Sequence, residues 1–137
     1  MKMFKLIGHT ADMRARVTGT TLKQTFRSAA KGFIELVGAA GEHGRHFTLK
    51  FELKASSIGN LLIEFLNELN YIVTAKKAVI TDVVIKDLQD NHISASVTGL
   101  KNIENIRYLR EIKAATYNDI KIRKTSRGFE AVFTLDI

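Results

Sequence analysis

Residues 3–17 read MFKLIGHTADMRARV and contain two apolar segments with a short polar segment between them. The first apolar segment, 3–7, is typical of a short strand. In the second, 13–17, every other residue is apolar and the residues between are arginines, which is the period of a half-buried strand. We therefore predict two strands joined by a turn at 9–12, His-Thr-Ala-Asp, with Asp12 at the start of the second strand.

Two amphipathic helices are predicted further along the chain. A threonine, Thr20 or Thr21, can cap the first helix, which extends to about Val37. A serine, Ser56 or Ser57, can cap the second. Apolar residues at helical spacing give each helix one side that faces the core. These residues are Leu22, Phe26, Ala29, Ala30, Phe33 and Val37 in the first helix, and Leu62, Phe65, Leu66, Leu69, Ile72 and Val73 in the second.

The second helix also has a polar side that carries little charge. Its residues are Asn60, Glu64, Asn67, Glu68 and Tyr71, which lie within about a third of the helix circumference at 3.6 residues per turn. A solvated helix face is the ordinary interpretation of such a side. Because it lacks the lysines found elsewhere in the chain, contact with a partner protein is the alternative.

The remaining segments define the fold class. Five more strands are predicted, at 47–53, 79–88, 92–97, 120–123 and 129–135. Segments 38–44 and 100–110 are interpreted as loops, and 113–117 is ambiguous between a strand and a helical turn. Helices that lie between groups of strands, without strict strand-helix alternation, predict an α+β fold. We expect two helices packed on a mostly antiparallel or mixed sheet, in one domain that spans 1–137.

Composition limits the classes of function. The 137 residues include 21 Lys and Arg against 14 Asp and Glu, a formal charge of +7 that favours an anionic partner such as RNA. The basic residues are spread over every segment, so we expect contact with RNA to be mainly indirect. No apolar run approaches the roughly 20 residues that span a bilayer. The absence of cysteine and of a secretory leader predicts a cytoplasmic protein without disulfides.

No motif in the chain indicates catalysis. The sequence contains neither Gly-x-Ser-x-Gly nor His-Glu-x-x-His, and its four histidines have no motif partners. Nothing in the residues therefore commits the chain to catalysis.

A cation site is the strongest chemical candidate among the residues. Asp12 stands at the start of a predicted strand, and Asp136 is followed at once by Ile137 and its terminal carboxylate. If the last strand lies next to the first, these three carboxylates can converge on one point. Hard oxygen ligands of this kind form a calcium- or magnesium-type site.

Four stretches of the chain resemble the archease family. They are His9-Thr10-Ala11-Asp12, the helical LLIEFLNEL at 61–69, EIKAATY at 111–117, and the closing Leu135-Asp136-Ile137. They occur in the family's order and are distributed over nearly the whole chain. The resemblance implies an α+β fold built from two strand-helix-strand-strand modules. The chain departs from the family's pattern in its strong basic charge and at Asn118, where the family often has histidine.

The resemblance implies an accessory protein in tRNA splicing or RNA repair, and not an enzyme. Archeases are known as activators of the RtcB-type RNA ligase, in which they promote guanylylation of a histidine and allow multiple turnover. Carried over to this chain, the cation site consists of Asp12, Asp136 and Ile137, usually with calcium. Residues implied in activation or contact with the ligase are Lys113, His9, Thr10 and Glu68.

Two other functions remain as alternatives. The first is a chaperone-like modulator of a tRNA methyltransferase, which the family resemblance also suggests. The second is a basic RNA-binding module that acts alone, which rests on the net charge.

Overall fold

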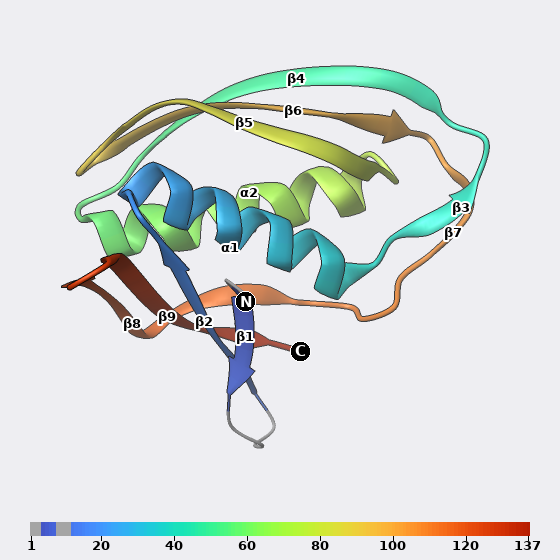
Figure 1. Ribbon diagram of the computed structural model, residues 1–137. Helices are drawn as coiled ribbons and strands as arrows, with labels where there is room; N and C mark the ends of the chain where they lie inside the picture. Colours follow the sequence, from blue (N-terminus) through green and yellow to red (C-terminus); the bar gives the residue numbers. More distant parts are fainter. Residues whose placement is uncertain (1–3, 8–11) are drawn as a thin grey trace.

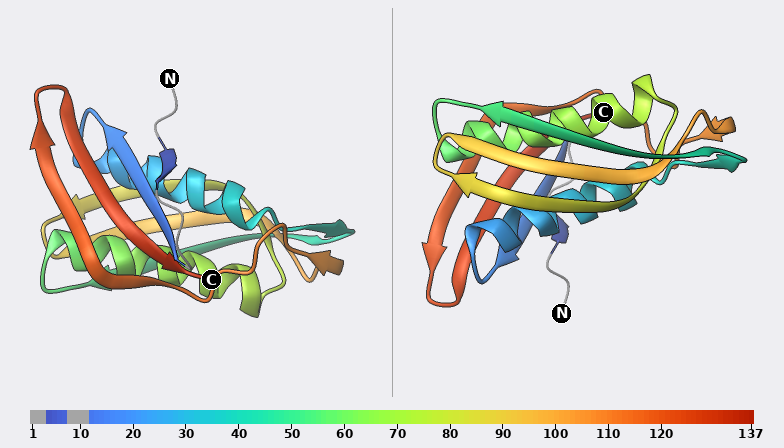
Figure 2. Two further views of the ribbon diagram at one scale, coloured as in Figure 1. Left: turned by 90° about the horizontal axis from the view of Figure 1, so that it is seen from below. Right: turned by 90° about the horizontal axis from the view of Figure 1, so that it is seen from above.

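Two helices lie between two antiparallel sheets (Figure 1). The computed structural model describes residues 4–7 and 12–137. A four-stranded sheet covers one side of the helices and a three-stranded sheet covers the other (Figures 1 and 2). The α+β class is therefore confirmed. In place of the expected single sheet, the described strands form three sheets, of which two enclose the helices, and every described strand pair is antiparallel.

The described elements have the following bounds. They are β1 (Phe4–Ile7), β2 (Met13–Gly19), α1 (Leu22–Val37), β3 (Ala40–Glu42), β4 (Arg45–Lys54), α2 (Ile58–Ala75), β5 (Val79–Gln89), β6 (His92–Lys101), β7 (Glu104–Arg107), β8 (Ala114–Thr125) and β9 (Gly128–Asp136).

The strand order shows two copies of one module. Sheet A has the order β1-β2-β9-β8, and sheet C has the order β4-β6-β5. The segments β2-α1-β8-β9 and β4-α2-β5-β6 are both strand-helix-strand-strand units, and in both the last strand lies between the other two. The expected modules are present, but they are nested: the second lies in the chain between the helix and the later strands of the first.

Each helix begins and ends where its local chemistry predicts. Thr21 caps α1 by accepting a hydrogen bond from the Gln24 backbone N–H at 3.0 Å, and Ser57 caps α2 by accepting one from Asn60 at 3.1 Å. Helix α1 ends at Gly38, whose φ of 55° is left-handed and is readily adopted by glycine. These contacts settle which of the two predicted threonines and serines form the caps.

One continuous apolar cluster joins both sheets and both helices. The Phe26 ring on α1 lies 5.9 Å from that of Phe65 on α2, and Phe65 lies 6.2 Å from Phe51 on β4. On the other side of the helices, Phe4 packs edge-on against the fully buried Phe133 of β9. The helices are thus buried on two sides, which explains why their apolar surfaces are wide.

Two predicted loops contain strands. Segment 38–44 includes β3 and segment 100–110 includes β7, and these two short strands pair with each other. Neither has the alternation of a buried strand, because both project beyond the core and are mostly exposed (Figure 1). The ambiguous segment 113–117 belongs to β8, which continues to Thr125 through a break in register between Thr116 and Lys121.

Candidate functional site

Three strand ends meet at one end of sheet A. Strand β9 pairs with β2 on one side and with β8 on the other. Met13 lies opposite Leu135, so the next positions along these strands are Asp12 and Asp136. Ala114 lies opposite Asp136, and the Lys113 N–H donates to the Asp136 carbonyl oxygen at 2.8 Å. The start of β2, the start of β8 and the end of β9 lie side by side in Figure 2.

Alternation along the strands sets the direction of these side chains. Leu135 is fully buried against the helices, so Asp136, the next residue, faces outward and is half-buried. Asp12 and Lys113 are exposed, and Ile137 is 45% exposed. We call Asp12, Lys113, Asp136 and Ile137 the sheet-end cluster. Its residues come from both ends of the described chain and from the start of β8, and all are accessible to a partner.

Helix α2 holds the start of β8 in place through two asparagines. The Asn67 side chain accepts from the Ala115 N–H at 2.7 Å and donates to the Ala115 carbonyl at 3.1 Å. Asn70 donates to the Ile112 carbonyl at 2.9 Å. The hypothesis that Asn67 faces a partner is therefore wrong, because its amide binds the chain's own backbone. Sequence reasoning did not single out Asn70, and only its uncharged polar side chain near the core-facing side signals this role.

The donor chemistry of the sheet-end cluster fits a hard divalent cation. Asp12 and Asp136 are the next positions beyond the Met13–Leu135 pair, and carboxylate oxygens are ligands of calcium and magnesium. Among residues 4–7 and 12–137, no group of three or more His, Asp or Glu side chains is arranged to hold a metal. The two aspartates therefore need a further ligand, which the family resemblance assigns to Ile137.

The remaining predicted contact residues are not part of this cluster. His9 and Thr10 lie outside the described residues. Glu68 is half-buried on α2, two positions before Asn70. Two positions correspond to about 200° around a helix, so Glu68 points away from Asn70. It lies one turn after Glu64, close to the side of α2 that contacts Tyr117.

A tyrosine and a glutamate join β8 to α2 a few residues beyond the cluster. Burial raises the pKa of Tyr117 above its ordinary value of 10.0, and a hydrogen bond to Glu64 and the charge of that carboxylate raise it further. Tyr117 is 49% exposed, so this contact lies at the surface where β8 meets the helix.

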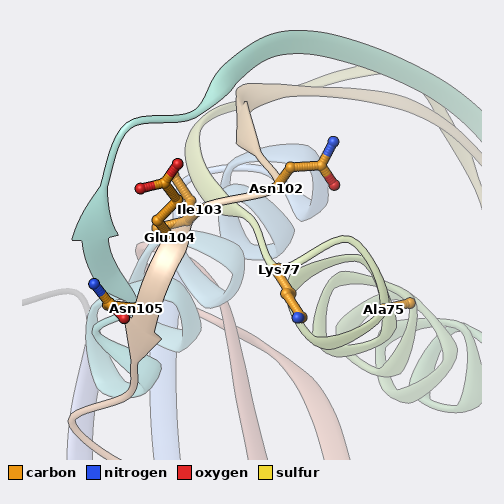
Figure 3. A pocket seen from close by; sticks show the side chains of 6 residues that line it. All are labelled: Ala75, Lys77, Asn102, Ile103, Glu104 and Asn105. Carbon is orange, nitrogen blue, oxygen red and sulfur yellow. The ribbon is translucent and has the colours of Figure 1, made fainter.

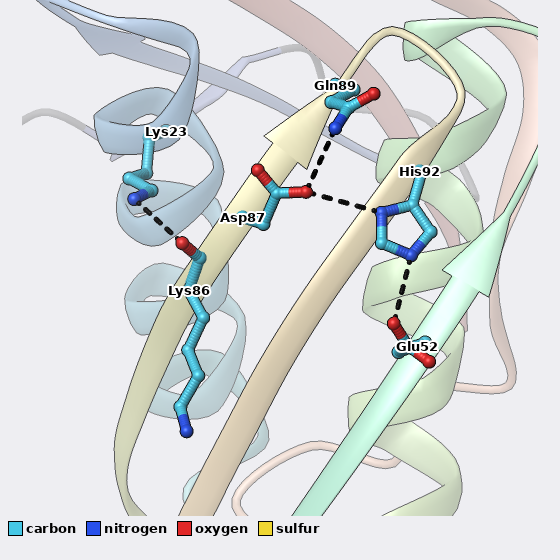
Figure 4. A network of polar contacts seen from close by, with 6 residues as sticks. All are labelled: Lys23, Glu52, Lys86, Asp87, Gln89 and His92. Atoms are coloured by element: carbon cyan, nitrogen blue, oxygen red, sulfur yellow. Dashed lines mark hydrogen bonds and ion pairs between the residues drawn. The ribbon is translucent and has the colours of Figure 1, made fainter.

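Two other polar features lie away from sheet A. A hollow of about 550 Å³ at the end of α2 is lined by Lys77, Asn102 and Glu104 among others (Figure 3). On sheet C, His92 lies 3.2 Å from Glu52 and 3.6 Å from Asp87 (Figure 4). The hollow is open and is lined mostly by exposed side chains, and the His92 contacts join side chains of sheet C to one another. Neither competes with the sheet-end cluster as a functional site.

The nested modules and the shared core define a class of small α+β proteins with two helices between two sheets. A family model described as the Archease protein family matches residues 4–137. The chain therefore belongs to the archease family. No described helix is long and apolar enough to cross a membrane.

Relatives and solved structures agree with this assignment. The chain is 26% identical to protein archease of Methanosarcina barkeri, with 99% of this chain and 97% of the relative covered. It is 28% identical to protein archease of Saccharolobus islandicus, with both chains fully covered. The solution structure of Methanobacterium thermoautotrophicum protein 1598 matches with a TM-score of 0.72 at 23% identity over the whole of both chains. A Thermotoga maritima crystal structure, described as "an archease, possible chaperone", matches with a TM-score of 0.68 at 20% identity over 97% and 96% of the two chains. These two structures support the fold alone.

Proposed function

We propose that this protein is a non-catalytic activator of an RtcB-type RNA ligase in tRNA splicing or RNA repair. The ligase joins RNA ends that carry a 3′-phosphate or 2′,3′-cyclic phosphate to 5′-hydroxyl ends, after GTP has guanylylated its histidine. Membership of the archease family supports the proposal. The observation that carries it is the sheet-end cluster, where the register of β2, β9 and β8 aligns Asp12, Asp136 and Lys113 at one exposed edge.

Charge and accessibility suggest how the cluster acts. A cation bound by Asp12, Asp136 and Ile137 would supply positive charge next to a triphosphate, which stabilises charge that develops during nucleotidyl transfer. The Lys113 side chain is exposed, and its backbone is fixed by the hydrogen bond to Asp136 and by the Asn70 contact with the same strand end. A flexible ammonium on an anchored backbone can reach into a neighbouring active site without disorder of the strand.

Guanylylation of a purified ligase by radiolabelled GTP tests the proposal. We expect Asp12→Asn, Asp136→Asn and Lys113→Ala each to remain folded by circular dichroism and to lose most of the stimulation. Asp82→Asn and Lys50→Ala, which remove the same charges from sheet C, are the matched controls and should stimulate fully. Full stimulation by all three cluster variants would contradict the proposal.

The description of the Thermotoga maritima protein as a possible chaperone favours a chaperone-like alternative. The family resemblance suggests a tRNA methyltransferase as its client. A chaperone-like protein protects its client from aggregation without any need for GTP. Methyltransferase solubility and activity, measured with and without the protein, separate the two functions. If the wild-type protein protects the methyltransferase and has no effect on ligase guanylylation, the alternative replaces the activator function.

A further inference from the structure

The outer face of sheet A carries a row of cations. Lys5 on β1 lies opposite Arg16 on β2, Arg16 lies opposite Val132 on β9, and Val132 lies opposite Lys121 on β8. The row thus crosses all four strands. Neighbouring strands are about 4.8 Å apart, so the three cationic positions extend over roughly 14 Å.

Burial shows that these side chains face outward. Their chain neighbours include Ala15, Val17 and Phe4, which face the helices, and Lys5 and Lys121 are exposed. Arg14 faces the same way. It lies two residues before Arg16 on β2, which corresponds to about 6.7 Å along the strand. We call Lys5, Arg14, Arg16 and Lys121 the cationic face.

No ion pair within the described part of the chain includes a residue of the cationic face. The one ion pair on this side of sheet A joins Arg123 to Glu130 at 2.9 Å. Like charges placed directly opposite each other, as Lys5 and Arg16 are, destabilise a sheet. The face therefore costs stability in the isolated protein, and an external anion would relieve that cost.

We propose that the cationic face binds the phosphodiester backbone of RNA. The face is a flat sheet surface, and Arg14 and Arg16 are spaced so that they can reach successive phosphates of one strand. No aromatic side chain belongs to the face, so it cannot stack bases, and recognition rests on charge and does not depend on sequence. RNA rather than DNA as the occupant rests on the proposed ligase function, and direct contact replaces the mainly indirect contact expected from the sequence.

The position of the cationic face next to the sheet-end cluster suggests a role for RNA binding. Asp12, Arg14 and Arg16 alternate along β2 with inward residues, so the sheet-end cluster and the cationic face lie on the same surface. RNA held on the face has one end close to the cluster, which is the part proposed to meet the ligase. The protein would thus present an RNA end together with the group that activates the ligase.

Fluorescence anisotropy with labelled oligouridylate tests the face without any ligase. The test variant is Lys5→Gln, Arg16→Gln and Lys121→Gln combined, which keeps Arg14 next to the cluster. Its control is Lys50→Gln, Lys54→Gln and Lys86→Gln combined, which removes the same charge from the exposed positions of sheet C. We expect the test variant to bind at least about tenfold more weakly than the control. Its log affinity should also fall less steeply with log salt, by about two units of slope, because three phosphate contacts are lost.

Guanylylation separates failure of this inference from failure of the proposed function, because that step uses GTP and no RNA. The inference requires the test variant to stimulate guanylylation as the wild type does while it loses RNA affinity. Equal loss of RNA affinity in both triple variants would overturn it, because binding would then depend on net charge alone. Unchanged RNA affinity with lost guanylylation would also overturn it, because the face would then bind an acidic protein surface.

Discussion

The module strands of sheets A and C are arranged in the same order, but the side chains on the outer faces of the two sheets differ in charge. In each, the last strand of a module lies in the centre, and its inward residues are buried against the helices. On sheet C, the outward positions at the middle of β6 are small hydroxyl residues, and the flanking strands carry acids as well as lysines, among them Glu52 and Asp87, which contact His92. On sheet A, the residues of the cationic face take part in none of the ion pairs among the described residues, and the strand ends carry Asp12 and Asp136.

The contrast separates what the fold requires from what function adds. Both modules need the same interior, because each buries one side of a helix. Only the outer face is free to differ, since its side chains are not packed in the core. The proposals above assign partner binding to the module that contains sheet A, where the charge is unbalanced, and leave the module that contains sheet C as scaffold.

The largest expected effect is on stability and is common to both modules. Phe133→Ala on β9 should lower the free energy of unfolding by about 3–5 kcal/mol, and Ile93→Ala on β6 by about 2–5 kcal/mol, because both side chains are fully buried. Urea denaturation followed by circular dichroism measures both. A single transition is expected in each variant, since one apolar cluster joins the modules. Two separate transitions would show that the modules unfold independently, and would contradict the conclusion that they share one core.

A smaller effect is expected where the modules are tied together. Asn67 lies on the helix of the second module and binds Ala115 on β8 of the first. Asn67→Ala should lower the free energy of unfolding by about 1–3 kcal/mol, because the backbone N–H and carbonyl of the buried Ala115 lose their hydrogen bonds. It should also reduce ligase stimulation, because the strand that positions Lys113 loosens. Asn60→Ala is the control, since that side chain bonds only locally to Ser56. Equal losses of stability and of ligase stimulation in the two variants would argue against a role for Asn67 in joining the modules.

Much of the fold is predictable because period and capping are local properties. The alternation at 13–17 and the caps at Thr21 and Ser57 depend on neighbouring residues, and the structure places these elements as expected. The nesting of the modules is not local. It depends on β8 and β9 returning to β2 after more than half the chain, and no pattern within a short segment contains that information.

The site was predictable only in part, for the same reason. The family motifs single out Asp12, Lys113 and Asp136, and the register brings their positions together. The sequence alone does not show that Arg16 lies in one row with Lys5 and Lys121, because those residues are far apart in the chain. It also could not show that Asn67 is used internally, because an asparagine on a helix surface has the same pattern in either role.

The difference between the sheets can be sharpened with His92. His92→Ala removes the cross-strand contacts to Glu52 and Asp87, which are exposed pairs (Figure 4). Such pairs contribute about 0.2–1 kcal/mol, so the loss of stability should be small. Guanylylation of the ligase and binding of oligouridylate should both be unchanged. A loss of either activity in this variant would mean that sheet C also binds a partner, and the assignment of function to sheet A alone would be wrong.

The smallest expected effect is the titration of Tyr117, where the two modules meet at the surface. Its pKa is raised first by burial and then by Glu64, so the folded protein favours the protonated phenol. This contribution to stability is fully present below pH 10.0, the ordinary pKa, and is lost as pH rises through the higher folded value. Phenolate absorbance, with Tyr117→Phe as the reference, measures the pKa.

Glu64→Gln should lower the pKa of Tyr117 only part of the way toward 10.0, because burial is the larger cause and is retained. A complete return to the ordinary value would mean that the variant also exposes the ring, so that β8 has moved from α2. No change at all would mean that Glu64 does not contact Tyr117 in solution. The size of the change therefore reports how firmly the edge strand of sheet A is held against the helix of the other module. That strand also carries Lys121 and follows Lys113, so the same titration reports on both proposed surfaces.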